Sequence, residues 1–143
     1  MFRMAPFKNT SLTDASITVL ASFEMTENGE TKSSFYTLKL EVTKITSLIL
    51  NWTIVHYIDE DSPFYSLTAE DIKNIDIEII VHVKAFDSIF SSDVVQRTSY
   101  TSDEIIYGAK FEKMYSPDET NRFTVLNLDL INRHFPAGLP EIS

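Results

Sequence analysis

Apolar residues recur at every second position along much of this sequence, and this spacing limits the fold more than any other feature. The segment 17–23 has Ile, Val, Ala and Phe at its odd positions, and the segment 76–83 repeats the pattern with Ile77, Ile79, Val81 and Val83. Successive side chains of a strand point to opposite faces, so each segment can bury one face and expose the other. Many short runs of this kind, with almost no helical spacing, predict an all-β fold, either a sandwich or a barrel.

Turn residues indicate where the first strands begin and end. Asn28-Gly29 is a strong tight-turn signal, and it predicts that strand 17–23 is joined through a polar loop to a neighbouring strand over 38–42. The segment 48–58 is rich in β-branched and aromatic residues and predicts a central strand. That strand should end before Pro63, because a residue without an N–H cannot extend a ladder.

The second half of the chain predicts one short helix followed by more strands. Thr68 precedes two acids, Glu70 and Asp71, and a hydroxyl cap followed by negative charge is typical of a helix start. The alternation over 76–83 keeps that helix short. Further strands are expected over 94–100, over 110–114 and around Phe123 and Val125, with a helical turn within 129–135. We expect one domain over 1–135 and a C-terminal tail over 136–143.

The charge and the absent residue types exclude several functional classes. The formal net charge is −9, from 21 acids and 12 basic residues. This disfavours duplex-DNA binding and favours cations in any water-filled passage that the chain lines, although solubility alone also explains it. There is no cysteine, so a disulfide framework and a thiol nucleophile are impossible. No apolar run approaches the roughly 20 residues that span a bilayer, and we expect no signal peptide.

Catalytic and metal-binding patterns are also missing. His56, His82 and His134 stand alone, without the spacing of a zinc site. We expect His56 and His82 to be hydrogen-bonded structural residues of strands rather than general bases. The acids Asp59-Glu60-Asp61 lack the further ligands of a calcium loop and are expected to bond local N–H groups in a turn. The residues by themselves indicate a soluble β-sandwich domain and leave its function open.

Three segments together resemble a known family. A strand ending in His56 is followed by Ile-Asp-Glu-Asp-Ser-Pro over 58–63, Arg97-Thr98-Ser99-Tyr100 comes later, and the segment 104–111 reads Glu-Ile-Ile-Tyr-Gly-Ala-Lys-Phe. In this order and spacing they are similar to the C-terminal cytoplasmic domain of inward-rectifier potassium channels of the prokaryotic type. The opening Phe2-Arg3-Met4-Ala5 resembles a fourth family segment, with Pro6 in place of the usual Asn.

The resemblance implies an immunoglobulin-like (E-set) β-sandwich with one or two short helices, and a channel domain rather than an enzyme. Four copies are expected to surround an aqueous vestibule that continues and gates the membrane pore. Potassium ions would be the permeant species, with no cofactor and no nucleic-acid partner. The parent channel is expected to be a multi-pass membrane protein of the voltage-gated class. This chain would then be a soluble fragment without the first strands, the membrane helices or the selectivity filter.

Asp14 and Lys84 are the pore-lining positions that the resemblance implies. Asp14 falls where the family places an acid in the vestibule, and a four-fold ring of carboxylates would concentrate cations there. Lys84 falls where strong rectifiers carry a second acid. A ring of lysines is expected to repel polyamines and magnesium and to give weak rectification. Alternatively, the two residues are a solvated acid at a strand start and an exposed lysine at a strand end.

The resemblance also implies a gate and a lipid contact. The segment 85–92 matches the loop that narrows the cytoplasmic pore mouth, and its gate residues would be Ala85, Phe86, Asp87 and Phe90. Either the two phenylalanines form an apolar constriction or both belong to the core. Lys8 matches a basic position that faces anionic lipid headgroups, but Asn9 replaces another, so lipid control stays open. Arg97 is expected to form a structural salt bridge within its strand.

Two other functions remain open at this stage. One is a stand-alone immunoglobulin-like binding module that uses an edge or loop surface, and the other is a small hydrolase built on a sandwich. Assembly is also open, because missing first strands would leave an exposed sheet edge. We expect a tetramer at high concentration or in a crystal, and a monomer when the chain is dilute.

Overall fold

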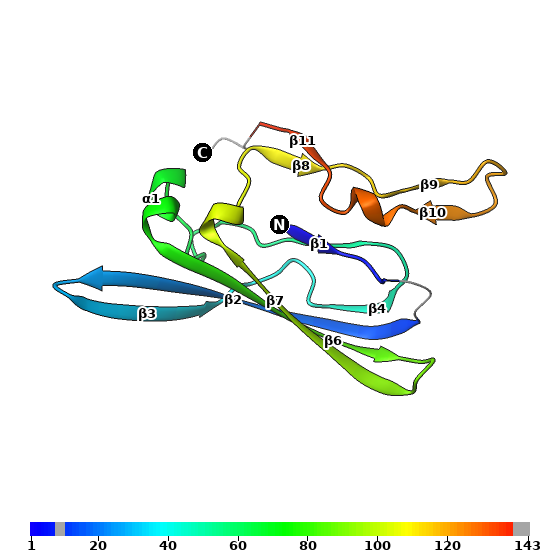
Figure 1. The fold of residues 1–143 in the computed structure, drawn as a ribbon, viewed down its shortest axis with the longest axis horizontal. Helices are drawn as coiled ribbons and strands as arrows, with labels where there is room; N and C mark the ends of the chain where they lie inside the picture. The colour runs from blue at the N-terminus through cyan, green and yellow to red at the C-terminus, as the bar shows by residue number, and fades with distance from the viewer. Residues whose placement is uncertain (8–10, 139–143) are drawn as a thin grey trace.

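The computed structural model describes residues 1–7 and 11–138, and its largest element is a five-stranded antiparallel sheet. In this main sheet β3 (Glu30–Thr37), β2 (Leu12–Glu27), β6 (Asp76–Asp87) and β7 (Ser92–Thr101) follow one another (Figure 1). β4 (Lys44–Leu48) pairs with the first residues of β2 on the edge away from β6. One edge of β2 is therefore shared by β4 near its start and by β3 near its end.

A second layer of short strand pairs lies on one side of the main sheet (Figure 1). β1 (Phe2–Met4) pairs with β5 (Trp52–Ile54), β8 (Ala109–Phe111) with β11 (His134–Pro136), and β9 (Tyr115–Pro117) with β10 (Thr124–Leu126). The helical elements of the described residues are α1 (Ala69–Asn74) and two 3₁₀ turns, η1 (Ser102–Glu104) and η2 (Leu128–Leu130). The predicted all-β sandwich is confirmed.

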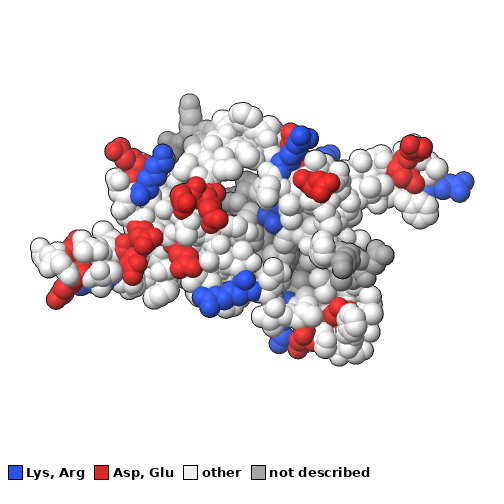
Figure 2. Space-filling view, in the orientation of Figure 1, with Lys and Arg blue, Asp and Glu red and all other residues white. Residues whose placement is uncertain are grey.

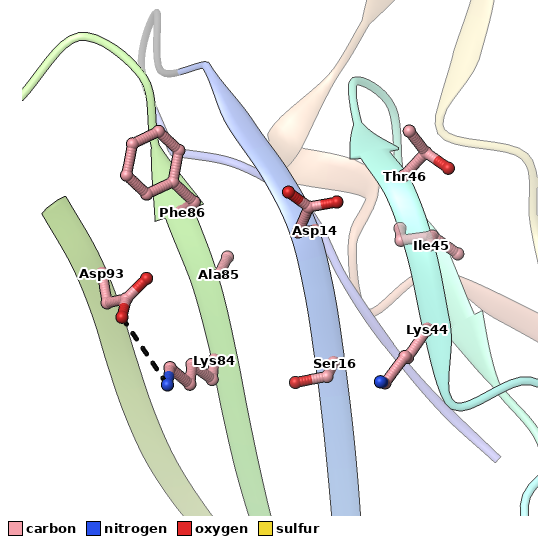
Figure 3. Close-up of a pocket in the computed structure, with 9 residues that line it drawn as sticks. All are labelled: Asp14, Ser16, Lys44, Ile45, Thr46, Lys84, Ala85, Phe86 and Asp93. Carbon is pink, nitrogen blue, oxygen red and sulfur yellow. Dashed lines mark ion pairs between the residues drawn. The ribbon is translucent and has the colours of Figure 1, made fainter. Parts of the chain in front are cut away.

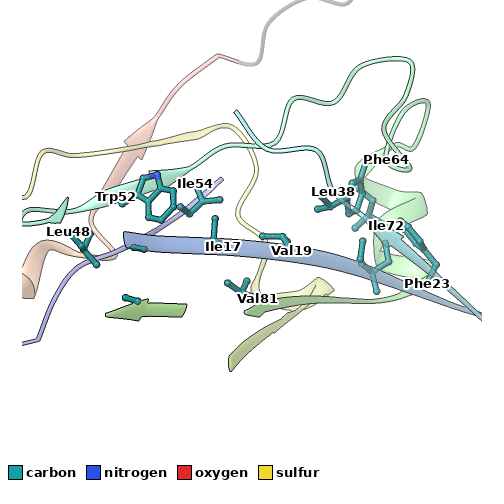
Figure 4. Packing of buried hydrophobic residues seen from close by; sticks show 14 residues of the cluster. Ile17, Val19, Phe23, Leu38, Leu48, Trp52, Ile54, Phe64, Ile72 and Val81 are labelled. Atoms are coloured by element: carbon teal, nitrogen blue, oxygen red, sulfur yellow. The ribbon is translucent and has the colours of Figure 1, made fainter. Parts of the chain in front are cut away.

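One face of β2 supplies the centre of the core. Its buried residues are Ala15, Ile17, Val19, Ala21 and Phe23. The cluster continues across β6 and into the second layer and the loops around α1 (Figure 4), with Val81, Trp52, Ile54, Phe64 and Ile72 among its members. The period-two pattern of the sequence is thus confirmed as the core pattern. Complete burial of side chains of this size contributes about 1.5–3 kcal/mol each to stability.

The helix prediction is confirmed together with its cap. Thr68 Oγ1 accepts a hydrogen bond from the Asp71 N–H at 3.1 Å, and the Asp71 carboxylate accepts one from the Thr68 N–H at 2.8 Å. This capping box satisfies N–H groups that the first turn leaves unpaired. The same backbone and side-chain bonds from Thr68 lower the pKa of Asp71.

Most of the later elements lie close to their predicted positions. The segments 76–83 and 94–100 fall within β6 and β7, while β8 covers less of 110–114 than expected. The late strand is β10, and the helical turn comes slightly earlier than expected, as η2. Pro136, the first residue of the predicted tail, is the last residue of β11 and faces Ala109. The limits of domain and tail stay predictions.

The predicted strand over 38–42 is wrong. The tight turn at Asn28-Gly29, with φ of 52° and 79°, pairs β2 with the residues that follow it immediately, so β3 ends at Thr37. Leu38 still donates its N–H to the Val19 carbonyl at 2.8 Å and is buried. Beyond it the chain leaves the sheet, and Leu40 forms an isolated bridge with His56.

The predicted central strand over 48–58 is also wrong. The apolar run divides into two short strands in different layers: β4 ends at Leu48 in the main sheet, and β5 begins at Trp52 in the second layer. A bend at residues 49 and 50 separates them. The run is apolar because it crosses the core between the layers, and composition alone does not distinguish a crossing from a central strand.

Arg3 joins β1 to the C-terminal part of the second layer. Its side chain is 7 % exposed, and its guanidinium donates to the carbonyl oxygens of Ile131 at 2.6 Å and Arg133 at 3.2 Å, and also to those of Glu112 and Leu130. The guanidinium carbon lies 4.3 Å from the centre of the Phe111 ring. A buried cation is tolerated only when its donors are satisfied, and here backbone carbonyls satisfy them.

Replacing Arg3 by Met should lower the free energy of unfolding by about 1.5–3 kcal/mol, because several part-buried carbonyls lose a charged donor. Urea denaturation followed by circular dichroism measures this change. Arg97→Met is the matched control, since Arg97 is exposed and forms no ion pair within the described part of the chain. The control should change stability by no more than about 0.5 kcal/mol. An equal effect of the two substitutions would refute the structural role of Arg3.

Candidate functional site

An open hollow of about 650 Å³ lies at one end of the main sheet, on the face away from the second layer. Strands β4, β2, β6 and β7 form its floor (Figure 3). Its lining side chains are mostly polar or charged, and the full set is Asp14, Ser16, Lys44, Ile45, Thr46, Lys84, Ala85, Phe86 and Asp93. Both predicted pore-lining residues, Asp14 and Lys84, therefore line one hollow.

Strand register explains which side chains meet in the hollow. Ser16 pairs with Lys84 on one side and with Lys44 on the other, so these three residues form one row across the sheet. Phe86 pairs with Asp93 on β7. Phe86 is two positions from Lys84 and therefore points to the same face. Figure 3 shows the row of Lys84, Ser16 and Lys44, with Phe86 and Asp14 beside it.

Asp14 reaches the hollow through an irregularity in β2. The register between β2 and β6 shifts by one residue between Thr13 and Ser16, which is a β-bulge. At the bulge Ala15 is fully buried while Asp14 is exposed and has a φ of 48°. This left-handed conformation is uncommon for residues other than glycine, and aspartate tolerates it better than most. Asp14 thus lies within a strand rather than at its start.

The hollow contains equal numbers of opposite charges. Two carboxylates, Asp14 and Asp93, face two ammonium groups, Lys44 and Lys84. Within residues 1–7 and 11–138 the one ion pair is Lys84 Nζ to Asp93 Oδ2, at 3.6 Å, with 62 % and 59 % of the two side chains exposed. Such an exposed pair contributes at most about 1 kcal/mol to stability. The face shown in Figure 2 likewise mixes acidic and basic side chains, without a continuous basic surface.

Half of the predicted gate loop, 85–92, is strand. Ala85, Phe86 and Asp87 are the last residues of β6, and only residues 88–91 connect it to β7. Ala85 is buried in the core cluster, and Phe86 is half-buried and lines the hollow. Phe90 is 78 % exposed in the connecting turn, so the alternative that both phenylalanines belong to the core is wrong for Phe90.

Asp87 stabilises the turn between β6 and β7. Its carboxylate is buried, and Oδ1 accepts hydrogen bonds from the N–H groups of Ile89 at 2.9 Å and Phe90 at 3.4 Å. The Ser88 N–H donates to the Ser11 carbonyl at 3.0 Å, which ties the turn to the start of β2. The predicted gate residue Asp87 therefore stabilises the turn from inside. Lys8, the predicted lipid-facing residue, lies outside the described residues.

His56 links a turn to a neighbouring loop through both of its ring nitrogens. His56 Nδ1 lies 2.6 Å from the Lys39 carbonyl oxygen, and Nε2 lies 2.7 Å from Ser62 Oγ. Ser62 is buried, and its oxygen also accepts the Phe64 N–H at 3.2 Å. The carbonyl can only accept, so Nδ1 carries a proton, and the pair ties a turn to a neighbouring loop. His56 is a hydrogen-bonded structural residue as predicted, although it lies in an isolated bridge rather than a strand.

Three other predicted groups, the acidic turn, Arg97 and His82, have few side-chain contacts. The Asp61 N–H donates to Asp59 Oδ1 at 3.1 Å, as expected for an acidic turn. Arg97 has no ion pair among the residues that the structure describes, so its predicted salt bridge is wrong. His82 lies in a strand as predicted, pairing in register with Thr18 and Arg97, but its ring is exposed and forms no hydrogen bond within the described residues, so its predicted hydrogen-bonded role is wrong. The described residues contain no cluster of histidine and carboxylate side chains that could hold a metal ion.

Sequence reasoning missed Asp93 and Lys44 as members of the hollow. Asp93 lies there because a four-residue connection fixes the β6–β7 register. Lys44 lies there because β4 joins the edge of β2 that β3 leaves free. The sequence offered one signal for Asp93, which directly follows the loop predicted over 85–92. It offered none for Lys44, since residue 44 had no predicted strand.

Comparisons with known proteins identify relatives along nearly the whole chain. The family model described as inward rectifier potassium channel C-terminal domain matches residues 1–140. The chain is 30 % identical over 117 residues to the inward rectifier potassium channel Kirbac3.1 of Paramagnetospirillum magnetotacticum, which covers 81 % of this chain and 40 % of that protein.

Two animal proteins are similar at the same level. Identity is 28 % over 98 residues to the inward rectifier potassium channel irk-1 of Caenorhabditis elegans, covering 67 % of this chain and 18 % of the relative. It is 31 % over 125 residues to the G protein-activated inward rectifier potassium channel 1 of Bos taurus, covering 83 % and 25 %. The chain thus spans less than half the length of these relatives.

The names of the relatives bear on two expectations. All three describe inward rectifier potassium channels, which agrees with the predicted resemblance and gives no support to the hydrolase or the binding module. None mentions voltage gating, so that expected class is unsupported. In the part of the chain that the structure describes, no helix is both long enough and apolar enough to cross a bilayer.

Replacing Asp87 by Ala should loosen the β6–β7 turn and lower the free energy of unfolding by about 1–3 kcal/mol, because two N–H groups lose a buried acceptor. Hydrogen exchange of the Ile89 and Phe90 amides should accelerate together with this loss. Asp93→Ala is the matched control on the same hairpin, with an exposed carboxylate, and should leave both amides protected. Unchanged exchange in Asp87→Ala would contradict the assignment.

Proposed function

The chain belongs to the family of inward rectifier potassium channel C-terminal domains, and we propose that it forms part of the cytoplasmic ion pathway of such a channel. In this proposal four copies surround a water-filled vestibule on the cytoplasmic side of the membrane. Potassium ions pass through it, and the domain regulates their flow without catalysis or a cofactor. The immunoglobulin-like character of the sandwich belongs to the same proposal.

The observation that carries the proposal is the shared hollow of Asp14 and Lys84. The family resemblance implies a pore-facing position for each residue separately, and both line one open, water-accessible surface of the main sheet. A symmetric assembly that turns this surface inward repeats every charge four times around the axis. Charges on the wall of a narrow aqueous passage change the local ion concentration, and salt weakens the effect.

Of the two phenylalanines among the four proposed gate residues, Phe90 is the better candidate for a constriction. It is exposed at the tip of the β6–β7 hairpin, whereas Phe86 is half-buried against the sheet. Four exposed rings brought together would form an apolar constriction that closes by steric contact or by loss of water. The Asp87 hydrogen bonds fix the turn that carries Phe90. A lipid contact of Lys8 remains a proposal from the resemblance alone.

The arrangement can be tested with spin labels, because the chain contains no cysteine. A nitroxide attached to Asp14→Cys should report two distances in a ratio of about 1.4, as at the corners of a square, when the chain is concentrated. A label on Lys32→Cys, in the exposed strand β3, is the control and should report longer distances. Dilution should remove both sets of distances as the tetramer dissociates into monomers.

Sedimentation over a concentration series complements the labels. A species of four chains that appears with concentration agrees with the proposal. A stable dimer at every concentration with one Asp14–Asp14 distance would contradict it. So would a tetramer in which the Asp14 labels are farther apart than the Lys32 labels.

A further inference from the structure

Lys84 has a neighbouring carboxylate, Asp93, that changes the electrostatic effect expected of a lysine at this position. Considered alone, a positive charge there should repel cations from the hollow. The structure places the Asp93 carboxylate 3.6 Å from the Lys84 ammonium group, on the neighbouring strand. Two opposite charges this close produce a weak field at distances several times larger than their separation.

We propose that Asp93 cancels the charge of Lys84 in the hollow, so that Asp14 and Lys44 determine how the hollow treats a polyvalent cation. This inference deepens the proposed function and rests on it for its relevance to ion flow. Its physical content concerns a single chain, because all four residues belong to one sheet. It makes Asp93 a specificity-determining residue, identified by the strand register that places it beside Lys84.

Register makes the pairing a fixed property of the hairpin. Lys84 pairs with Val95 and Phe86 pairs with Asp93, so the carboxylate is diagonal to the lysine on the same face of the sheet. Diagonal neighbours on adjacent strands are within reach of long side chains. The buried Asp87 carboxylate holds the connecting turn and thereby the register. The cancellation depends on proximity and not on the strength of the pair, which is small for exposed groups.

The charge count of the hollow follows directly. Asp14 and Asp93 contribute two negative charges, and Lys44 and Lys84 contribute two positive ones, so the lining is formally neutral. Removing Lys84 alone leaves one net negative charge, and removing Asp93 alone leaves one net positive charge. Removing both restores neutrality. If Asp93 instead contributed nothing to the electrostatic potential in the hollow, the double substitution would behave like the loss of Lys84.

Titration of the ¹⁵N-labelled 143-residue chain with spermine, followed at the amides of Ser16, Thr46 and Lys84, tests this inference at low ionic strength. Lys84→Gln should bind spermine about three- to fivefold more tightly than the unaltered chain, and Asp93→Asn should bind it more weakly by a similar factor. Lys84→Gln/Asp93→Asn should return to within about twofold of the unaltered chain. The exchanged pair Lys84→Asp/Asp93→Lys should do the same.

Matched controls separate local charge from net charge. Glu30→Gln and Lys32→Gln change the net charge equally but lie on the exposed strand β3, away from the hollow. They should leave the shifts at Ser16 and Thr46 unchanged. The inference is overturned if the double variant binds like Lys84→Gln, if Asp93→Asn has no effect, or if the controls match the hollow variants. Because the titration needs no assembly, it can succeed even if the label distances disprove the four-fold vestibule.

Discussion

The antiparallel ladder between β2 and β6 is the interaction on which the remaining structure depends. It runs from Leu12–Asp87 to Glu24–Asp76 and is the longest pairing in the described sheet. One face of the ladder carries the core residues, such as Val19 and Val81, and the other carries Ser16 and Lys84. Side chains alternate between faces with a period of two, so a slip by one residue would exchange the core with the hollow. The hydrophobic core therefore fixes the register that assembles the hollow.

The bulge at Asp14 and the Arg3 contacts show how the ladder is connected to its surroundings. The bulge adds one residue to β2 without moving Ala15 out of the core, so the charge at position 14 stands exposed beside the ladder. Arg3 acts at the opposite layer, where short strands have few ladder bonds of their own. Its donors link β1 to carbonyls that follow β8 and surround η2. A charged donor thus joins short strands that pair with only one neighbour each.

Sequence patterns correctly predicted elements whose structure depends on residues close together in the chain. They failed where the structure depends on which distant segment pairs with the element. Thr68 and Asp71 cap α1 from three positions apart, and the core alternation over 17–23 lies within one strand, so both could be predicted. The prediction of a strand over 48–58 was wrong because a segment that crosses between layers buries the same apolar side chains as a central strand. The family resemblance identified Asp14 and Lys84 as candidates. Asp93 and Lys44 could not be predicted, since cross-strand register and the free edge of β2 placed them there.

The Lys84–Asp93 pair shows that the contribution of an ion pair to stability differs from its effect on the local electric field. Its contribution to stability is small, because water solvates both partners and side-chain ordering opposes the attraction. Its effect on the field in the hollow does not depend on that small energy, because the field is set by the positions of the two charges and not by the strength of their attraction. In the proposed ion pathway, an ion pair too weak to stabilise the domain would still influence which ions approach it. The charge of Lys84 therefore has to be considered together with Asp93, which the strand register places beside it.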